Sequence, residues 1–305
     1  MSKHLFGLVV TPHGVAANNR GENEGNITTL QKILWQGEVH TTVSAEAIRW
    51  AIRYHWQRSG LEVNRQWDDQ KADHDWRDPK WAKWSAGQGY IDDDVLGFML
   101  AEGAKSEGNE AEAQGTGRGK RAKGTCEKRR GMLEVTRAIS LTPFAGDITF
   151  NAKSGEKGAT SLYGTEVHAT RYQYGFALTP EDLREKARSL QVLNAVVALG
   201  EVAGNQSRFL FDFSPDAIVL RWTDDFAPRL LYGFGLDGAK LAVPEVVRRV
   251  EAGDIDAKEL VVGGALVATP AGDSLKRLGA TVVPGVKAAA EEVAKRMRKD
   301  LGLKS

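Results

Sequence analysis

The sequence predicts an α+β fold built on a ferredoxin-like or RRM-type sheet. Its main elements run in the order strand, helix, strand, strand, helix, strand, which is the βαββαβ order of that sheet. The chain has 305 residues, of which 42% are hydrophobic and 27% charged, so it can bury a sizeable core. Large polar insertions interrupt this order after the first helix and before the second.

The first strand and helix lie within residues 4–60. HLFGLVVTP is a short apolar run closed by Pro12, which predicts a strand. A loop rich in Gly and Asn follows over residues 16–32, and VSAEAIRWAIRYHWQRSG then predicts a helix with Ser44 as N-cap and Gly60 at its end. We expect an apolar stripe of Ala45, Ile48, Ile52 and His55, and a cationic, aromatic face that holds Arg49, Arg53 and Trp56.

An irregular, tryptophan-containing region follows from residue 61 to about 130. Strand-like alternation returns in DDDVLGFMLAEG, where we expect Asp92, Asp93 and Asp94 to form a solvated strand entry. Residues 103–128 are first acidic and then basic, contain many glycines and show no periodicity. They therefore predict a flexible insertion.

The second half of the chain predicts two strands, a hairpin, a helix and further strands. GMLEVTRAISLTPF contains β-like stretches, and residues 147–176 form two β-rich arms around the tip SGEKGA, which predicts a protruding hairpin. Thr179 and Pro180 open the second predicted helix, which ends near Gly200 or Gly204. AIVLRW and LLYGFG predict strands, and residues 286–301 predict an amphipathic helix with the exposed pairs Glu291 with Lys295 and Glu292 with Arg296.

Charge and cysteine content limit the classes of function. The net charge is only +1, but GTGRGKRAKGTCEKRRG, residues 115–131, contains seven basic residues and one acid. A polyanion would therefore be held by local basic groups rather than by the field of the whole protein. Cys126 is the single cysteine, which excludes a disulfide framework and fits a cytoplasmic protein, and no apolar run predicts a membrane span.

Motifs for catalysis are not found in the sequence. GTGRGK differs from a phosphate-binding loop because Gln114 stands where a glycine is required and Arg121 where Ser or Thr is required. The six histidines lie far apart, consecutive aspartates cannot all face one magnesium ion, and no G-x-S-x-G nucleophile motif occurs. We therefore expect no enzyme activity, no cofactor and no metal.

Three segments together resemble a known family. NNRGENEGNITTLQK, followed by VSAEAIRWAIRYHW and then by GNQSRFLFDFSPDAIVLRWT, is similar to the DevR-type branch of the CRISPR backbone family, the Cas-seven family, and most similar to the type I-B group. The resemblance covers most of the chain. It implies a hand-shaped backbone subunit of a Cascade complex, with an RRM-like palm, a finger insertion after the first helix and a β-hairpin thumb.

The resemblance also implies boundaries and partners. Residues 1–60, 131–146 and 179–305 would form the palm, residues 61–130 the fingers, and residues 147–178 the thumb. Copies of the chain would stack in a helical filament along crRNA, each thumb pressing between bases so that the guide pairs with target DNA in short segments. The implied partners are crRNA, further copies of the chain, target DNA and the other Cascade subunits: a small cap-like backbone subunit, a large subunit and a crRNA-processing endonuclease.

A protein that holds RNA without reading its sequence contacts phosphates and leaves base edges free. The candidate RNA contacts are Asn18, Asn19, Arg20, Asn26, Lys32, Ser44, Arg49, Arg53, Arg137, Lys153, Lys157, Asn205, Gln206 and Arg208. The basic segment would add non-specific affinity for DNA, through Arg118, Lys120, Arg121, Lys123, Lys128, Arg129 and Arg130.

Two alternatives stay open at this point. One is a type III-like backbone subunit that cleaves target RNA, for which Asp147 and Glu22 are the loop acids we nominate. Magnesium-dependent cutting at regular intervals would favour it. The other is a stand-alone RRM-like RNA-binding protein, against which RNP-type aromatic motifs are absent from the predicted central strands.

Overall fold

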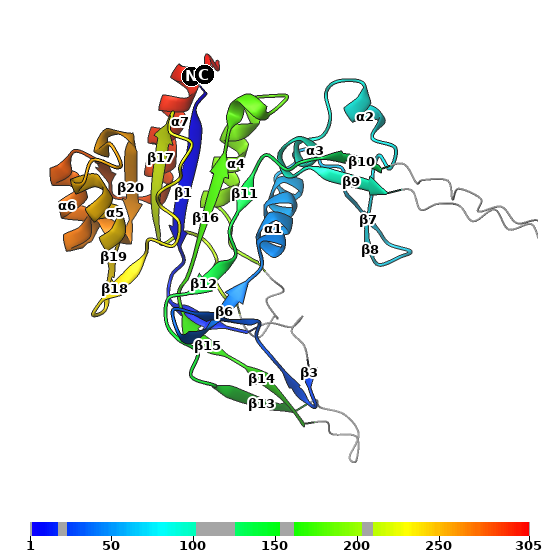
Figure 1. The fold of residues 1–305 in the computed structure, drawn as a ribbon. Helices are drawn as coiled ribbons and strands as arrows, with labels where there is room; N and C mark the ends of the chain where they lie inside the picture. Colours follow the sequence, from blue (N-terminus) through cyan, green and yellow to red (C-terminus); the bar gives the residue numbers. More distant parts are fainter. Residues whose placement is uncertain (1, 18–22, 102–125, 153–161, 203–209, 305) are drawn as a thin grey trace, which may run out of the picture.

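A nine-stranded mixed sheet dominates the computed structural model, which describes residues 2–17, 23–101, 126–152, 162–202 and 210–304 (Figure 1). The order along the sheet is β21 (Thr281–Val283), β20 (Leu260–Gly264), β17 (Ala217–Thr223), β1 (His4–Val10), β16 (Tyr172–Leu178), β12 (Ala138–Ser140), β6 (Glu38–Val43) and β5 (Lys32–Trp35), with β11 (Glu134–Val135) also on β16. The β20–β21 pair is parallel, and the other pairs along the sheet are antiparallel.

Apolar clusters cover both faces of the central strands. All seven residues of β1 are buried, and alternate side chains enter different clusters, Leu5 and Val9 on one face and Phe6 and Leu8 on the other. The first face packs against α1 (Ala45–Arg58), α4 (Arg188–Val197) and α7 (Val286–Leu301), and the second against α5 (Pro244–Glu251) and α6 (Pro270–Leu278). The fold is therefore α+β with a sheet buried between helices.

Helix α1 begins and ends as the sequence predicts, but its buried face differs. The Ser44 hydroxyl accepts a hydrogen bond from the Ala47 amide at 3.2 Å, which confirms the N-cap. Trp56 is 1% exposed and packs with Ile48 and Ile52, while its indole N–H donates to the Gln191 carbonyl. Its expected place on the cationic face was wrong, because position 56 lies one turn from Ile52 on the apolar stripe.

The inserted region after α1 contains short elements around an aromatic core. They are β7 (Gln66–Asp68), β8 (Asp73–Asp75), α2 (Ala82–Ser85), α3 (Ile91–Leu96), β9 (Phe98–Ala101) and β10 (Cys126–Arg129). Trp81 is 1% exposed, and its ring lies 4.7 Å from the centroids of both Trp76 and Phe98. The expected solvated strand at residues 92–94 was wrong: the three aspartates are buried in α3, where internal donors replace water.

A protruding hairpin is confirmed, and it is shorter than the predicted range. It consists of β13 (Ile148–Ala152) and β14 (Leu162–Glu166), and β14 also pairs with β4 (Ile27–Thr28), which pairs with β3 (Asn23–Glu24). β15 (His168–Thr170) pairs instead with β2 (Gly14–Ala16), and β16 lies between β1 and β12 in the main sheet. The end of the range 147–178 thus lies in the sheet.

From residue 179 on, the structure confirms the predicted strand β17 and helix α7. It corrects the second predicted helix and the predicted LLYGFG strand. A 3₁₀ turn (Pro180–Asp182) precedes α4. The backbone amides of Arg184 and Glu185 donate to the Asp94 carboxylate instead of to carbonyls one helical turn earlier, so the helix does not start at Pro180. Residues 230–234 of LLYGFG contain a turn in which Tyr232 has φ 55°, and its last residue begins β18 (Gly235–Asp237), which pairs with β19 (Lys240–Ala242). Two further 3₁₀ turns are Ala257–Glu259 and Ala265–Ala268. On α7, Glu292 pairs with Arg296 as predicted, whereas Glu291 pairs with Arg298.

Candidate nucleic-acid interface

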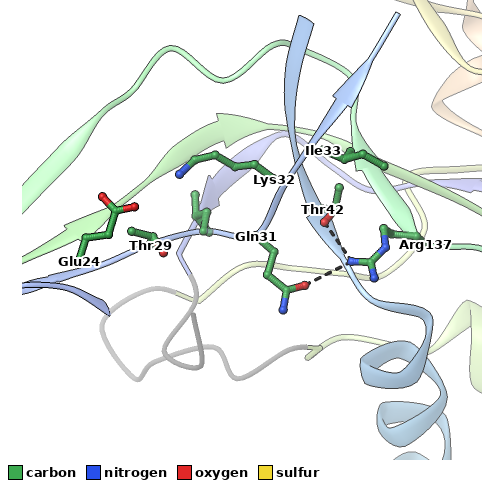
Figure 2. A pocket seen from close by; sticks show the side chains of 8 residues that line it. Glu24, Thr29, Gln31, Lys32, Ile33, Thr42 and Arg137 are labelled. Carbon is green, nitrogen blue, oxygen red and sulfur yellow. Dashed lines mark hydrogen bonds between the residues drawn. The ribbon is translucent and has the colours of Figure 1, made fainter. Parts of the chain in front are cut away.

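An open groove of about 650 Å³ lies where the loop before β5 meets β6 and β12 (Figure 2). Most of its lining side chains are polar, and two are cationic. The lining residues are Glu24, Thr29, Leu30, Gln31, Lys32, Ile33, Thr42 and Arg137. Two of the predicted RNA contacts, 105 positions apart in the chain, are thereby brought together at one site.

Arg137 is the exposed cation of this groove. Its Nη1 donates to the Gln31 side-chain oxygen at 3.3 Å and to the Thr42 hydroxyl at 3.2 Å (Figure 2). Both bonds use one of the three guanidinium nitrogens, so they orient the side chain and leave further N–H groups for an anion. The geometry suits a phosphate oxygen.

Lys32 is the second cation, and it is already paired. Its ammonium lies 2.6 Å from Oε2 of Glu166 and 4.8 Å from the centroid of the Phe144 ring. The side chain is 29% exposed. An ammonium has three N–H donors, so this pairing does not exhaust its capacity.

The other predicted contacts on α1 hold the inserted region. Arg49 donates to the carbonyls of Leu133 and Leu96, and burial lowers its pKa, with Arg53 as the next cause. Arg53 donates to Asp92 at 3.0 Å. Together with Trp50 and Glu134, both arginines line a second open groove of about 590 Å³. RNA contact by Ser44, Arg49 and Arg53 stays a prediction, but each has a structural role.

Sequence reasoning missed an exposed aromatic row. Trp50 and Tyr54 stack with ring centroids 5.2 Å apart, and His74 lies edge-on between Trp50 and Trp67. The three large rings are between 39% and 52% exposed. The i, i+4 spacing of Trp50 and Tyr54 on α1 was a usable signal, because Glu46, Trp50 and Tyr54 form the exposed ridge opposite Ile48 and Ile52.

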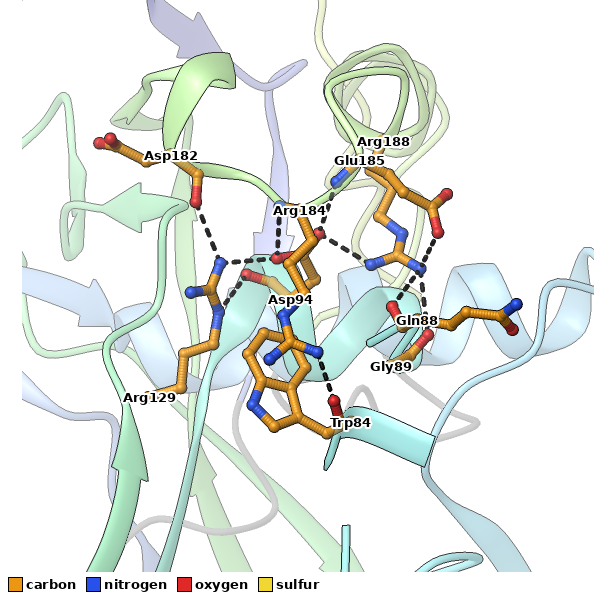
Figure 3. Close-up of polar contacts among 9 residues, drawn as sticks. All are labelled: Trp84, Gln88, Gly89, Asp94, Arg129, Asp182, Arg184, Glu185 and Arg188. Atoms are coloured by element: carbon orange, nitrogen blue, oxygen red, sulfur yellow. Dashed lines mark hydrogen bonds and ion pairs between the residues drawn. The ribbon is translucent and has the colours of Figure 1, made fainter. Parts of the chain in front are cut away.

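Asp94 forms a polar hub that ties α3 to the segment before α4 (Figure 3). Its carboxylate receives Arg129 at 2.6 Å, Arg188 at 2.8 Å and the backbone amides of Arg184 and Glu185 at 3.1 and 3.3 Å. The Arg184 guanidinium lies 3.1 Å from the Trp84 ring centroid. A fully buried carboxylate with this many donors holds its elements in one geometry.

The neighbouring aspartates are also satisfied internally. Asp92 accepts from the Asn64 amide at 2.8 Å, and Asp93 accepts from the Asn64 side chain and the Trp81 indole at 3.1 Å each. Burial raises the pKa of Asp93 to about 6, and the charge of Asp92 adds to the shift. In the part of the chain that the structure describes, no group of three metal-binding side chains is arranged to hold an ion.

The basic segment and the loops are described only in part. Lys128 is exposed, Arg130 pairs with Glu134, and Arg129 belongs to the Asp94 hub, so of these three Arg129 has a structural role. Asn26 is exposed, and its carbonyl accepts from the Gly164 amide at 2.8 Å. The remaining candidates lie outside the described residues: Asn18, Asn19, Arg20, Lys153, Lys157, Asn205, Gln206, Arg208, Arg118, Lys120, Arg121 and Lys123.

A curated relative decides which family the chain belongs to. It is the CRISPR-associated protein Cas7/Cst2/DevR of Myxococcus xanthus (strain DK1622), 49% identical over 313 residues that cover 97% of this chain and 98% of that one. The chain belongs to the Cas7/Cst2/DevR family. This confirms the resemblance stated from three segments of the sequence. No family model matches the sequence.

Solved structures agree with this family at the level of the fold. A chain described as a CRISPR RNA-guided surveillance complex is 14% identical with a TM-score of 0.53, and the match covers 96% of this chain and 99% of that one. Another, described as a CRISPR RNA-guided surveillance complex, pre-nicking, is 11% identical with a TM-score of 0.56 over 97% and 100% of the two chains. No helix among the described residues of this Cas7/Cst2/DevR-family protein is long and apolar enough to cross a membrane.

Proposed function

We propose that this Cas7/Cst2/DevR-family protein is a non-catalytic crRNA-binding backbone subunit of a type I-B-like Cascade complex in the cytoplasm. Copies oligomerise in a helical filament along crRNA and support pairing of the guide with target DNA. The observation that carries the proposal is the 49% identity over 97% of the chain to a Cas7/Cst2/DevR protein. Its other partners are the small cap-like subunit, the large subunit and the crRNA-processing endonuclease of the complex.

The strand order supports a ferredoxin-like palm. The strands that follow the βαββαβ order are β1, β12, β16 and β17, with α1 and α4 between them, and they lie in the sheet as β17, β1, β16, β12. That is the 4-1-3-2 antiparallel order of this fold. Because helices cover both faces of β1 and β17, RNA is held at the end of the sheet, where the groove of Lys32 and Arg137 lies beside the hairpin.

The groove supports phosphate contact rather than base reading. Its two cations come from the first residue of β5 and from the segment before β12, and its remaining donors are amide and hydroxyl groups. Cations that neutralise phosphates release counterions, which makes binding salt-dependent and independent of sequence. This is the behaviour that a guide holder of arbitrary spacer sequence requires.

A salt titration of RNA binding tests the proposal. If Lys32 and Arg137 each neutralise one phosphate, Lys32→Ala with Arg137→Ala flattens the slope of log K against log salt by about 1.4, at about 0.7 per single-strand contact. The matched control, Lys276→Ala with Arg277→Ala, removes two exposed cations from α6 on the other face and leaves the slope unchanged.

Two outcomes of the same experiment would overturn parts of the proposal. An unchanged slope on two unrelated RNAs of equal length would remove the groove from the RNA path. Magnesium-dependent cutting of bound target RNA at regular intervals would overturn the non-catalytic assignment, with Asp147, exposed before β13, as the first residue to replace. Purification with small RNA of uniform length separates a guide holder from a stand-alone RNA-binding protein.

A further inference from the structure

One carboxylate oxygen joins the groove to the protruding hairpin. Oε2 of Glu166, the last residue of β14, accepts from the Lys32 ammonium at 2.6 Å and from the Leu30 amide at 2.7 Å. The Glu166 side chain is 13% exposed and the Lys32 side chain 29% exposed, so water screens the pair only partly. The loop before β5 is therefore held to the hairpin by a charged contact.

Among the described residues at the groove, positive and negative charges are equal in number. Lys32 and Arg137 bring two positive charges, and Glu24 in the lining and Glu166 beside it bring two negative charges. A balanced site attracts a polyanion weakly at long range, because the field of each cation is cancelled by a nearby carboxylate. An ion pair between Glu166 and Lys32 lowers the affinity of the groove for phosphate below what the lysine alone would give.

We infer that Glu166 is a competing carboxylate that sets the RNA affinity of this groove. In the free protein it occupies Lys32, and an RNA phosphate that binds Lys32 must displace it or share the ammonium with a second negative group. The inference rests on the proposed function and adds an affinity-determining residue to it. A phosphate that contacts Lys32 alone then gains little binding free energy. An RNA that also contacts Arg137 gains enough to compete with the Glu166 carboxylate.

The same geometry couples the hairpin to occupancy of the groove. β14 is held to the loop strand β4 by a parallel pairing, Gly164 with Ile27 and Thr165 with Thr28, and Glu166 continues that attachment through Leu30 and Lys32. When a phosphate takes Lys32, the carboxylate keeps the Leu30 amide but loses its cation. The attachment of the hairpin base is thereby weakened, not lost.

The test compares RNA binding by full-length Glu166→Gln and wild type, with a fluorescein-labelled unstructured RNA as probe. Gln keeps the shape and an oxygen for the Leu30 amide, so thermal melting should show an intact fold. We expect binding about two- to fivefold tighter at low salt, the range of a partly exposed ion pair. Glu166→Ala removes the same carboxylate and should change affinity in the same direction.

Two controls separate the local effect from net charge. Glu245→Gln removes one carboxylate from the exposed Glu245–Arg248 pair on α5 and should leave RNA affinity unchanged. In a Lys32→Ala background, Glu166→Gln should have no effect, because the competition acts through Lys32.

Three results would overturn the inference. Weaker binding by Glu166→Gln would mean that the carboxylate positions Lys32 for RNA. Equal affinities of Glu166→Gln and Glu245→Gln would mean that only total charge matters. Salt-independent binding, or no binding, by wild type would overturn the proposed function and this inference together, whereas the first two results leave the proposed function standing.

Discussion

At the scale of single residues, the same side-chain type serves two different purposes in this chain. Arg137 is exposed and held by two neutral acceptors, so its guanidinium is available to a phosphate. Arg49 is partly buried, and its N–H groups donate to the backbone carbonyls of Leu133 and Leu96. Both residues are arginines, so the difference follows from the exposure and the hydrogen-bond acceptors around each position.

Asp93 gives a prediction for the pH dependence of stability. Burial raises its pKa to about 6 in the folded protein, above the ordinary value of 3.8. The folded state therefore binds more protons than the unfolded state between about pH 4 and pH 6, and this group's contribution to the free energy of unfolding falls as pH rises through that window. The slope reaches at most about 1.4 kcal/mol per pH unit.

Chemical denaturation of wild type and Asp93→Asn at pH 4 to 8.5 measures this contribution. The wild type should lose stability relative to the variant as pH rises from 4 to 6, and the difference should be constant above pH 7. Asp237→Asn, which replaces an exposed carboxylate on β18, is the control and should run parallel to wild type. Parallel curves for wild type and Asp93→Asn would show that Asp93 is ionised throughout.

At the scale of elements, the β13–β14 hairpin is attached at its base and free of the core. β14 pairs with β13 on one side and with β4 on the other, whereas Phe150 on β13 is 80% exposed. Little apolar area is buried along the hairpin, so its conformation contributes little to the stability of the sheet. Its exposed apolar side chain suits contact with another molecule.

Shortening the hairpin tests its role in assembly. Ala152 and Leu162 lie opposite each other in register, so replacing residues 153–161 by Asn-Gly closes the hairpin with a two-residue turn. We expect the melting temperature of the monomer to change by no more than about 2 °C, and ordered assembly along crRNA to be impaired. Sedimentation of the complex with RNA reads the assembly, and full-length, target-competent filaments would contradict the assignment.

At the scale of the whole molecule, burial of the sheet on both faces decides where nucleic acid can bind. The second face of β1 packs against α5 and α6, which excludes the open sheet face that RRM-type proteins use. Among the described residues, one open polar groove lies at the end of the sheet and another lies along α1. Under the proposed function, guide RNA and target DNA would use separate surfaces.

Removing residues 103–125, with Asn-Gly in their place, tests this separation. β9 and β10 stay paired because Ala101 and Cys126 are already opposite each other. The deletion removes Arg118, Lys120, Arg121 and Lys123, so we expect weaker binding of duplex DNA, mostly at low salt, and nearly unchanged retention of crRNA. Electrophoretic mobility shifts with duplex DNA and quantification of copurified RNA measure both, and loss of crRNA would place the segment on the guide surface.

Local patterns in the sequence were sufficient for several elements and for the family. The apolar run of β1, the Ser44 N-cap of α1 and the bounds of α7 follow from neighbouring residues, because alternation, capping and amphipathic spacing act within a few positions. Lys32 and Arg137 were each predicted as RNA contacts, but the sequence did not predict that they line one groove.

Tertiary structure alone decided the roles that depend on distant partners. Asp92, Asp93 and Asp94 look like solvated acids in the sequence, yet their donors Arg188 and Asn64 lie 94 and 28 positions away, and only folding brings them together. Trp56, Arg49 and Glu166 are decided in the same way, by partners on other elements. The physical reason is that burial and desolvation depend on the whole chain, whereas helix and strand periodicity depend on a short window.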